Sequence, residues 1–266
     1  MTISDKIKLN NGIDMPMFGL GVYAINSGKE TQNAVRYALD AGYRLIDTAS
    51  MYNNEEDVGI AVRESKIPRE EIFVTTKLWD NDHEYQKVFI AFDKSLRKLN
   101  IEYIDLYLIH WPAYSERGET WKAFEKILES GKCKAIGISN YTTNHIKELL
   151  PHANVIPSVN QVEFNTFSYK KSLLEFCRSK NIQLEAYSPL LRGRKFNDPA
   201  LTELAKKYSK SPVQIMIRWV LQKHVIAIPK SANKKRIEEN ADVFDFNISN
   251  EDMQHLDSLS YNFGVV

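Results

Sequence analysis

Four polar side chains stand where apolar runs of the chain give out. Asp47, Lys77 and His110 end the runs YRLID, IFVTTK and DLYLIH, and Tyr52 follows Asp47 by five residues. Each side chain can ionise or donate a proton. Burying four such groups in an ordinary core would be costly without partners, so we expect them to surround a pocket.

A tyrosine beside a lysine and a histidine suits proton transfer to or from a carbonyl oxygen. A free tyrosine has a pKa of about 10, and a nearby ammonium favours the phenolate. We therefore expect Lys77 to bring the pKa of Tyr52 closer to the working pH and Tyr52 to act as a general acid. Asp47 is expected to hold Lys77 by a charge-assisted hydrogen bond, and His110 to orient the carbonyl through its ring N–H.

Short apolar runs recur along the chain and are separated by amphipathic stretches with helical spacing. The runs are FGLGVY, YRLIDTA, IFVTTKLW, IDLYLIHW, AIGISN, SVNQVEF, QLEAYSPL and VIAIPKS. The helical stretches include TQNAVRYALDAG, NEEDVGIAVRES, YQKVFIAFDKSLRKLN and LLEFCRSKN. This alternation predicts a parallel sheet. A typical barrel of this kind needs roughly 250 residues, and the chain has 266. The alternation and the length together favour an α/β (β/α)8 TIM barrel as one domain, 1–266, over an open doubly wound sheet.

Three segments are expected to be additions to the barrel. Asn11 and Gly12 lie between short alternating segments and predict an N-terminal β-hairpin with a type I′ turn. Helical patterns after DPALTELA and in the tail from Ser249 predict two additional helices.

Composition narrows the partners and the compartment. The formal charge is +1, with 43% hydrophobic and 26% charged residues, so neither nucleic acid nor an anionic membrane is expected as a partner. Cys133 and Cys177 form no CxxC pattern and are expected to be reduced thiols. The N-terminus has no apolar signal core and no run is long enough to span a membrane. We expect a cytoplasmic protein without a metal.

Several nucleotide and hydrolase motifs are excluded. The segment from Gly19 to Ala24 formally matches GxGxxG/A, with Asp40 near the ribose-ligand distance, but a loop follows where the Rossmann motif requires a helix. The two glycines are instead expected to let the first strand pack and its loop approach a ligand. The Walker, HExxH and GxSxG motifs are absent from the sequence.

A local basic cluster lies in the segment IPKSANKKRIEEN. It contains Lys230, Lys234, Lys235 and Arg236. Lys230 and Ser231 end the eighth strand, and Arg236 falls in the first turn of the next helix, where backbone N–H groups also favour anions. The cluster suits a phosphate group.

In this order, DTASMY, VTTKLW, LIHWP, GISN, NQVE, AYSPL and IPKS followed by RIEEN resemble an aldo-keto reductase over nearly the whole chain. The resemblance implies a monomeric barrel that binds NADPH without a Rossmann fold. It also implies hydride transfer from the nicotinamide to an aldehyde or ketone. Asp47, Tyr52, Lys77 and His110 match the catalytic tetrad of the family, with Tyr52 as proton donor.

The same resemblance assigns further contacts. Ser139, Asn140 and Gln161 would bind the nicotinamide carboxamide and Tyr187 would stack on its ring. The other implied cofactor contacts are Gly21, Val22, Tyr23, Asp47, Ser188, Leu190, Lys230, Ser231, Arg236, Glu239 and Asn240. Ser188 and Leu190 would line the pyrophosphate, and Lys230, Ser231 and Arg236 would hold the 2′-phosphate, which favours NADPH over NADH. The implied substrate contacts are Tyr23, Tyr52, Trp79, His110 and Trp111.

Two short segments indicate the smaller microbial type of reductase, which acts on 2-oxoaldehydes or keto-sugars. They are the tail SYNFGVV and the loop LRGRKFNDPAL, and both suggest an open pocket with broad substrate use. Two alternatives remain at this point. A Schiff-base aldolase could use Lys77 or Lys230, and a non-catalytic NADPH-binding barrel could serve a structural or redox-sensing role.

Overall fold

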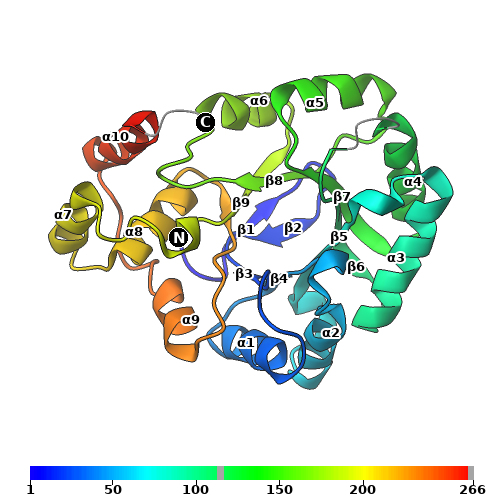
Figure 1. The fold of residues 1–266 in the computed structure, drawn as a ribbon, viewed down its shortest axis with the longest axis horizontal. Coiled ribbons are helices and arrows are strands. Elements are labelled where there is room, and N and C mark those ends of the chain that lie inside the picture. The colour runs from blue at the N-terminus through cyan, green and yellow to red at the C-terminus, as the bar shows by residue number, and fades with distance from the viewer. Residues whose placement is uncertain (113–116, 263–266) are drawn as a thin grey trace.

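Eight parallel strands form a closed barrel inside a ring of helices (Figure 1). The computed structural model describes residues 1–112 and 117–262. The strands neighbour one another in chain order, and parallel bridges from Phe18 to Ala227 and from Gly21 to Lys230 join the last strand to the first. The strands are β3 Leu20–Gly21, β4 Leu45–Asp47, β5 Phe73–Leu78, β6 Ile104–Ile109, β7 Cys133–Ser139, β8 Val159–Glu163, β9 Gln183–Tyr187 and β10 Ile226–Ala227. The predicted (β/α)8 barrel is confirmed, and the open sheet is wrong.

The helices cover the outside of the barrel (Figure 1). They are α1 Lys29–Asp40, α2 Glu55–Glu64, α3 Tyr85–Leu99, α4 Arg117–Glu129, α5 Thr143–Leu149, α6 Lys171–Ser179, α7 Pro199–Tyr208, α8 Pro212–Gln222, α9 Lys234–Ala241 and α10 Asn250–Ser258. The helix expected from Ser249 is α10. A helix was expected after DPALTELA, but α7 already begins inside this segment at Pro199, and α8 follows it. The sequence patterns did not single out α4 or α5. Helix α8 is buried at every position from Gln214 to Leu221, and its polar residues Gln214, Arg218 and Gln222 recur four residues apart along one face.

The predicted N-terminal hairpin is present as β1 Lys6–Lys8 paired antiparallel with β2 Asp14–Pro16. Its turn differs from the predicted type I′. The N–H of Leu9 donates to the carbonyl of Ile13 at 2.8 Å, which leaves a three-residue loop. Gly12 has φ +87° whereas Asn11 is not among the residues with positive φ. A three-residue loop with glycine in the left-handed region therefore replaces the two-residue turn.

The first strand depends on close backbone approach. A Cβ on Gly19 would lie 2.4 Å from Cγ of Leu45, and one on Gly21 would lie 3.1 Å from the carbonyl oxygen of Ile228. The packing role expected of these glycines is therefore present in the structure. Their approach to a ligand remains a prediction.

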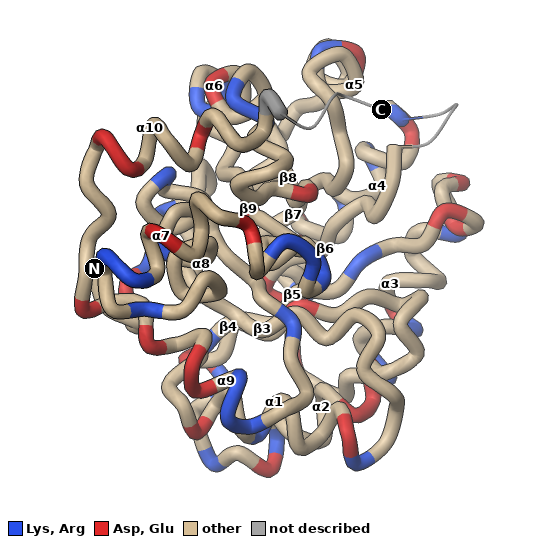
Figure 2. Tube along the Cα trace, turned by 60° about the vertical axis from the view of Figure 1, so that its left-hand side comes forward, with Lys and Arg blue, Asp and Glu red and all other residues tan. Residues whose placement is uncertain are grey.

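Charged residues are interspersed along the whole trace (Figure 2), in keeping with the near-neutral formal charge. Within the described parts of the chain, none of the helices is both long and apolar enough to cross a bilayer. The last four residues of the tail SYNFGVV lie outside the described residues.

Candidate active site

A buried ion pair lies at the carboxyl ends of β4 and β5. Nζ of Lys77 donates to Oδ1 of Asp47 at 2.6 Å and to the carbonyl of Thr48 at 2.8 Å. Lys77 is 0% exposed and Asp47 is 2% exposed. Burial is the strongest single influence and acts against the charge of Lys77, but the charge and hydrogen bond of Asp47, together with Tyr52 and Glu185, outweigh it, so the pKa of Lys77 is raised. The lysine is thus held as a cation inside the barrel.

Tyr52 lies next to this pair on the short 3₁₀ helix Ser50–Tyr52, which follows β4. Nζ of Lys77 is 5.1 Å from the centre of the Tyr52 ring. Burial raises the pKa of Tyr52 and outweighs the lowering by Lys77. The expected net shift toward the working pH is therefore wrong in direction, because the sequence does not reveal how deeply the phenol is buried. A phenol with a raised pKa stays protonated at neutral pH, which is the form that donates a proton.

His110 directly follows β6 and faces the same site. The centre of its ring is 5.7 Å from that of Tyr52 and 5.3 Å from that of Trp79. Burial, helped by the charge of Lys77, lowers the pKa of His110 to about 3. Its Nδ1 is buried and has no hydrogen-bond partner among the described residues. The imidazole is therefore neutral across the physiological range.

A second polar group ties together the ends of β6, β7, β8 and β9. Nδ2 of Asn140 donates to the carbonyl of His110 at 2.9 Å, and Oδ1 of Asn140 accepts from the Tyr187 hydroxyl at 2.9 Å. The hydroxyl of Ser139 donates to the carbonyl of Gln161 at 2.9 Å. The structure thus brings together all four residues that were assigned to the nicotinamide.

Gln161 connects this group to the ion pair and to a carboxyl that the sequence reasoning did not assign. Its Nε2 donates to Oδ2 of Asp47 at 2.7 Å and to Oε2 of Glu185 at 2.8 Å. Glu185 is 0% exposed. Its position two residues before Tyr187 in the alternating strand QLEAY could have indicated that it faces the barrel interior.

The loop after β3 borders the tetrad. The N–H of Val22 donates to the carbonyl of Asp47 at 3.0 Å, and the Val22 side chain is buried. The Tyr23 ring packs edge-on against Tyr52 with centroids 5.0 Å apart. Gly21 is bound through its N–H to the carbonyl of Pro229 at 3.3 Å, which places this loop beside the end of the barrel's last strand.

The residues assigned to the pyrophosphate lie after β9. Ser188 has φ +47°, and its carbonyl accepts from Nδ2 of Asn165 at 3.2 Å. Leu190 is half-buried two residues later. The chain therefore turns sharply at Ser188, directly after Tyr187 at the end of β9.

The basic cluster lies at the start of α9. Lys230 and Arg236 are exposed, and no carboxylate of the described residues lies within ion-pair distance of either side chain. Ser231 is buried and its hydroxyl accepts from the N–H of Asn233 at 3.1 Å. Of the two residues assigned to the adenine, Asn240 is buried, and Glu239 accepts a hydrogen bond from Ser211 at the start of α8.

Aromatic side chains surround the opening of the barrel. Tyr23 is 47% exposed and Trp111, directly after His110, is 44% exposed. Trp79 follows β5 and packs against His110. Exposed aromatic surface around a polar base is typical of a ligand-binding cleft.

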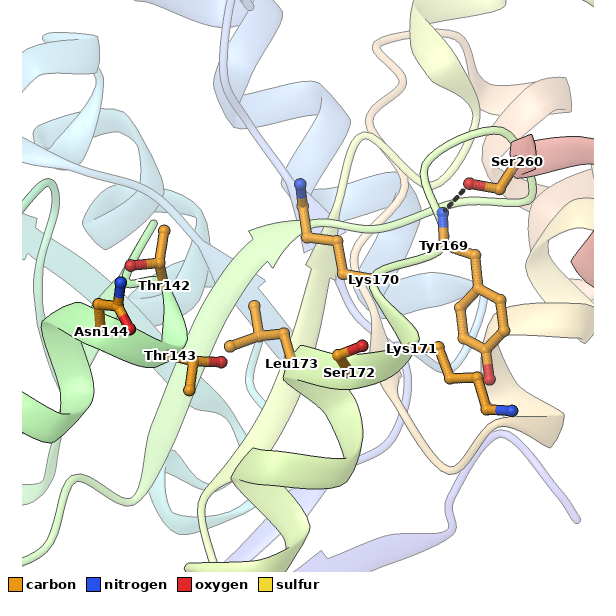
Figure 3. Close-up of a pocket in the computed structure, with 9 residues that line it drawn as sticks. All are labelled: Thr142, Thr143, Asn144, Tyr169, Lys170, Lys171, Ser172, Leu173 and Ser260. Atoms are coloured by element: carbon orange, nitrogen blue, oxygen red, sulfur yellow. Dashed lines mark hydrogen bonds between the residues drawn. The ribbon is translucent and has the colours of Figure 1, made fainter. Parts of the chain in front are cut away.

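A separate surface pocket of about 470 Å³ lies between the starts of α5 and α6 (Figure 3). Thr143, Lys170 and Ser260 are among the residues that line it, and none of the tetrad residues does so. The pocket is therefore distinct from the tetrad.

Comparison with known proteins identifies the family. The model of the aldo/keto reductase family matches residues 17–261. Glyoxal reductase of Bacillus subtilis is 48% identical over 97% of this chain and 94% of its own, and the 9,11-endoperoxide prostaglandin H2 reductase of Trypanosoma cruzi is 48% identical over 96% and 91%.

Solved structures support the same family. An aldo-keto reductase from a Medee basin deep-sea metagenome library superposes with a TM-score of 0.93 at 44% identity, over 98% of this chain and 97% of that one. A Bombyx mori aldo-keto reductase solved in complex with NADP superposes with a TM-score of 0.90 at 36% identity, over 97% and 94%. The chain belongs to the aldo/keto reductase family. It is an oxidoreductase.

The Asp47→Asn variant should lose stability, because the Lys77 ammonium would remain buried without its carboxylate. We expect the free energy of unfolding in urea to fall by about 3 kcal/mol. Adding Lys77→Met to Asp47→Asn removes the stranded charge and should restore much of the loss. An Asp47→Asn variant as stable as the wild type would contradict the view that the two side chains form an ion pair.

Proposed function

We propose that this protein reduces aldehydes and ketones to alcohols with NADPH, with Tyr52 as the general acid. The observation that carries the proposal is the convergence of a protonated phenol, a buried ammonium and a neutral imidazole at the mouth of one barrel. Carbonyl reduction needs such a proton donor beside the carbonyl oxygen.

The side chains divide the work at the carbonyl oxygen. Bound NADPH supplies the hydride to the carbonyl carbon. Tyr52 transfers its proton to the oxygen, and the Lys77 ammonium stabilises the phenolate that remains. Neutral His110 donates a hydrogen bond from Nε2 to the same oxygen and so orients it. Asp47 keeps Lys77 charged and in place.

The residues at the nicotinamide end fit a carboxamide and an aromatic ring. Oε1 of Gln161 accepts from none of the described residues, so it is available to a carboxamide N–H. Ser139 and Asn140 supply further polar atoms, and the Tyr187 hydroxyl is bound to Asn140, which fixes its ring for stacking.

The phosphates are assigned to two other segments. Ser188 and Leu190 lie where a pyrophosphate would pass from the nicotinamide toward α9, and Gly21, Val22 and Tyr23 form the opposite side. Exposed Lys230 and Arg236, with Ser231, would bind the 2′-phosphate, and Glu239 and Asn240 would face the adenine. The NADP complex of the Bombyx mori relative supports this choice of cofactor.

The substrate class is a small carbonyl compound, such as a 2-oxoaldehyde or a keto-sugar. Tyr23, Trp79 and Trp111 would contact it around the polar base formed by Tyr52 and His110. The name of the Bacillus subtilis glyoxal reductase, which is 48% identical, supports a 2-oxoaldehyde. We further propose that residues 1–266 act as one domain, in a cytoplasmic monomer.

The competing functions have weaker support. A Schiff-base aldolase needs a neutral lysine nucleophile, whereas Asp47 raises the pKa of Lys77. A non-catalytic NADPH-binding barrel has no need for a complete tetrad. The structure holds all four members at the same end of the barrel.

A direct assay distinguishes these functions. Methylglyoxal with NADPH should give substrate-dependent loss of the NADPH absorbance and one alcohol formed per NADPH consumed, and a reaction without methylglyoxal is the control. Trapping of the aldehyde on a lysine by borohydride, without NADPH oxidation, would indicate the aldolase. Tight NADPH binding without turnover across a panel of aldehydes would indicate the non-catalytic barrel.

Replacement of the phosphate-binding arginine should alter cofactor preference. Arg236→Ala is expected to raise the Kd for NADPH by about tenfold or more, because a charge-assisted contact to the 2′-phosphate is lost, and to leave the Kd for NADH unchanged. Lys206→Ala, which removes an exposed positive charge from α7 outside the basic cluster, is the control. Equal weakening of both cofactors by Arg236→Ala would contradict the 2′-phosphate assignment.

A further inference from the structure

Glu185 is a buried carboxyl inside the barrel without an assigned role. It lies in the middle of β9, in register with Gln161 of β8 on one side and Ile226 of β10 on the other. Its Oε2 accepts from Gln161, and its Oε1 is buried without a hydrogen-bond partner among the described residues. A buried carboxyl with only one partner is costly for a structural group, which points to a functional reason for keeping it.

The contact with Gln161 fixes which way that amide points. A side-chain amide has two N–H donors, and those of Gln161 are taken by Asp47 at 2.7 Å and by Glu185 at 2.8 Å. Rotating the amide by half a turn would place its oxygen against two carboxyl oxygens. The observed orientation therefore leaves Oε1 as the free polar atom, on the side where the carboxamide of a nicotinamide would bind.

The charges around Glu185 are unbalanced. Asp47 faces it from β4 and Lys77 from β5, with Tyr52 and neutral His110 beyond them, while β10 contributes Ile226 and Ala227 at this level. One ammonium therefore faces two carboxyls. Burial, followed by the charge of Asp47, raises the pKa of Glu185 to about 8. The group can thus change its charge near physiological pH.

We propose that Glu185 is a positioning residue that acts through Gln161: it directs the amide oxygen toward the nicotinamide, and in its ionised form it favours the oxidised, cationic ring over the reduced one. This inference rests on the proposed function, because it needs the nicotinamide beside Gln161. It assigns Glu185 a role in holding the nicotinamide and in the balance between NADP⁺ and NADPH, not in the chemical step.

The orientation effect is tested by binding without turnover. In Glu185→Leu, Gln161 keeps only Asp47 as an acceptor and is held less firmly in its orientation, so the Kd for NADPH should rise by about tenfold. The Kd for 2′-phospho-ADP-ribose, which lacks the nicotinamide, should not change. Glu55→Gln is the matched control, since Glu55 is a buried carboxyl that accepts from Thr76 on the outer face of β5. Equal weakening of both probes would overturn the orientation role.

The charge effect is tested in Glu185→Gln, which keeps an acceptor oxygen and the shape of the side chain. A cationic ring favours ionised Glu185, so NADP⁺ binding releases a proton and tightens as the pH rises through about 8 in the wild type. The Kd ratio of NADP⁺ to NADPH should therefore fall by about fivefold between acidic and alkaline buffer. Titration of the 2′-phosphate affects both cofactors alike and cancels in this ratio.

In Glu185→Gln the ratio should be independent of pH. A pH-independent ratio in the wild type, or an unchanged pH profile in the variant, would overturn the charge role, and thermal unfolding of both variants shows whether they are folded. Failure of the proposed function gives a different result. In that case the wild type would not oxidise NADPH with methylglyoxal, whatever the pH dependence of its Kd ratio.

Discussion

The buried contact between Lys77 and Asp47 is the constraint on which the site depends. An ammonium without solvent exposure costs several kcal/mol unless a carboxylate and further acceptors surround it. The carboxylate of Asp47 and the carbonyl of Thr48 provide them, both from the end of β4, while Lys77 comes from β5. Pairing of these adjacent parallel strands brings the two side chains to the same end of the barrel. In addition to the effect of burial, the positive charge of Lys77 then acts to lower the pKa of both Tyr52 and His110.

The second oxygen of Asp47 extends this constraint across the barrel. It accepts from Gln161, which also donates to Glu185, so one chain of hydrogen bonds joins β5, β4, β8 and β9. Asn140 forms a parallel link between His110 and Tyr187. Positions that come from distant parts of the sequence are thereby held at fixed separations before any ligand binds. Such preorganisation is what a proton donor and a hydride acceptor need.

The arrangement of strands and the four tetrad positions could be predicted because both follow local rules. Apolar runs that end in polar residues mark strand ends, and parallel strands bring these ends together. The alternating strand QLEAY indicates that Glu185 faces inward, but only the barrel shows that Gln161 and Asp47 share that interior. The raised pKa of Tyr52 follows from burial, which depends on the folded environment and not on the neighbouring residue types.

The electrostatic states at the barrel mouth then follow from that environment. Burial keeps Tyr52 protonated and His110 neutral, while Asp47 keeps Lys77 charged. These are the forms required for one phenolic proton to reach a carbonyl oxygen. The most direct test compares wild type with Tyr52→Phe, measuring NADPH affinity by fluorescence and kcat with methylglyoxal. The account predicts an unchanged Kd and a kcat lower by about a hundredfold or more. A Tyr52→Phe enzyme that retains its kcat would contradict the assignment of Tyr52 as the proton donor.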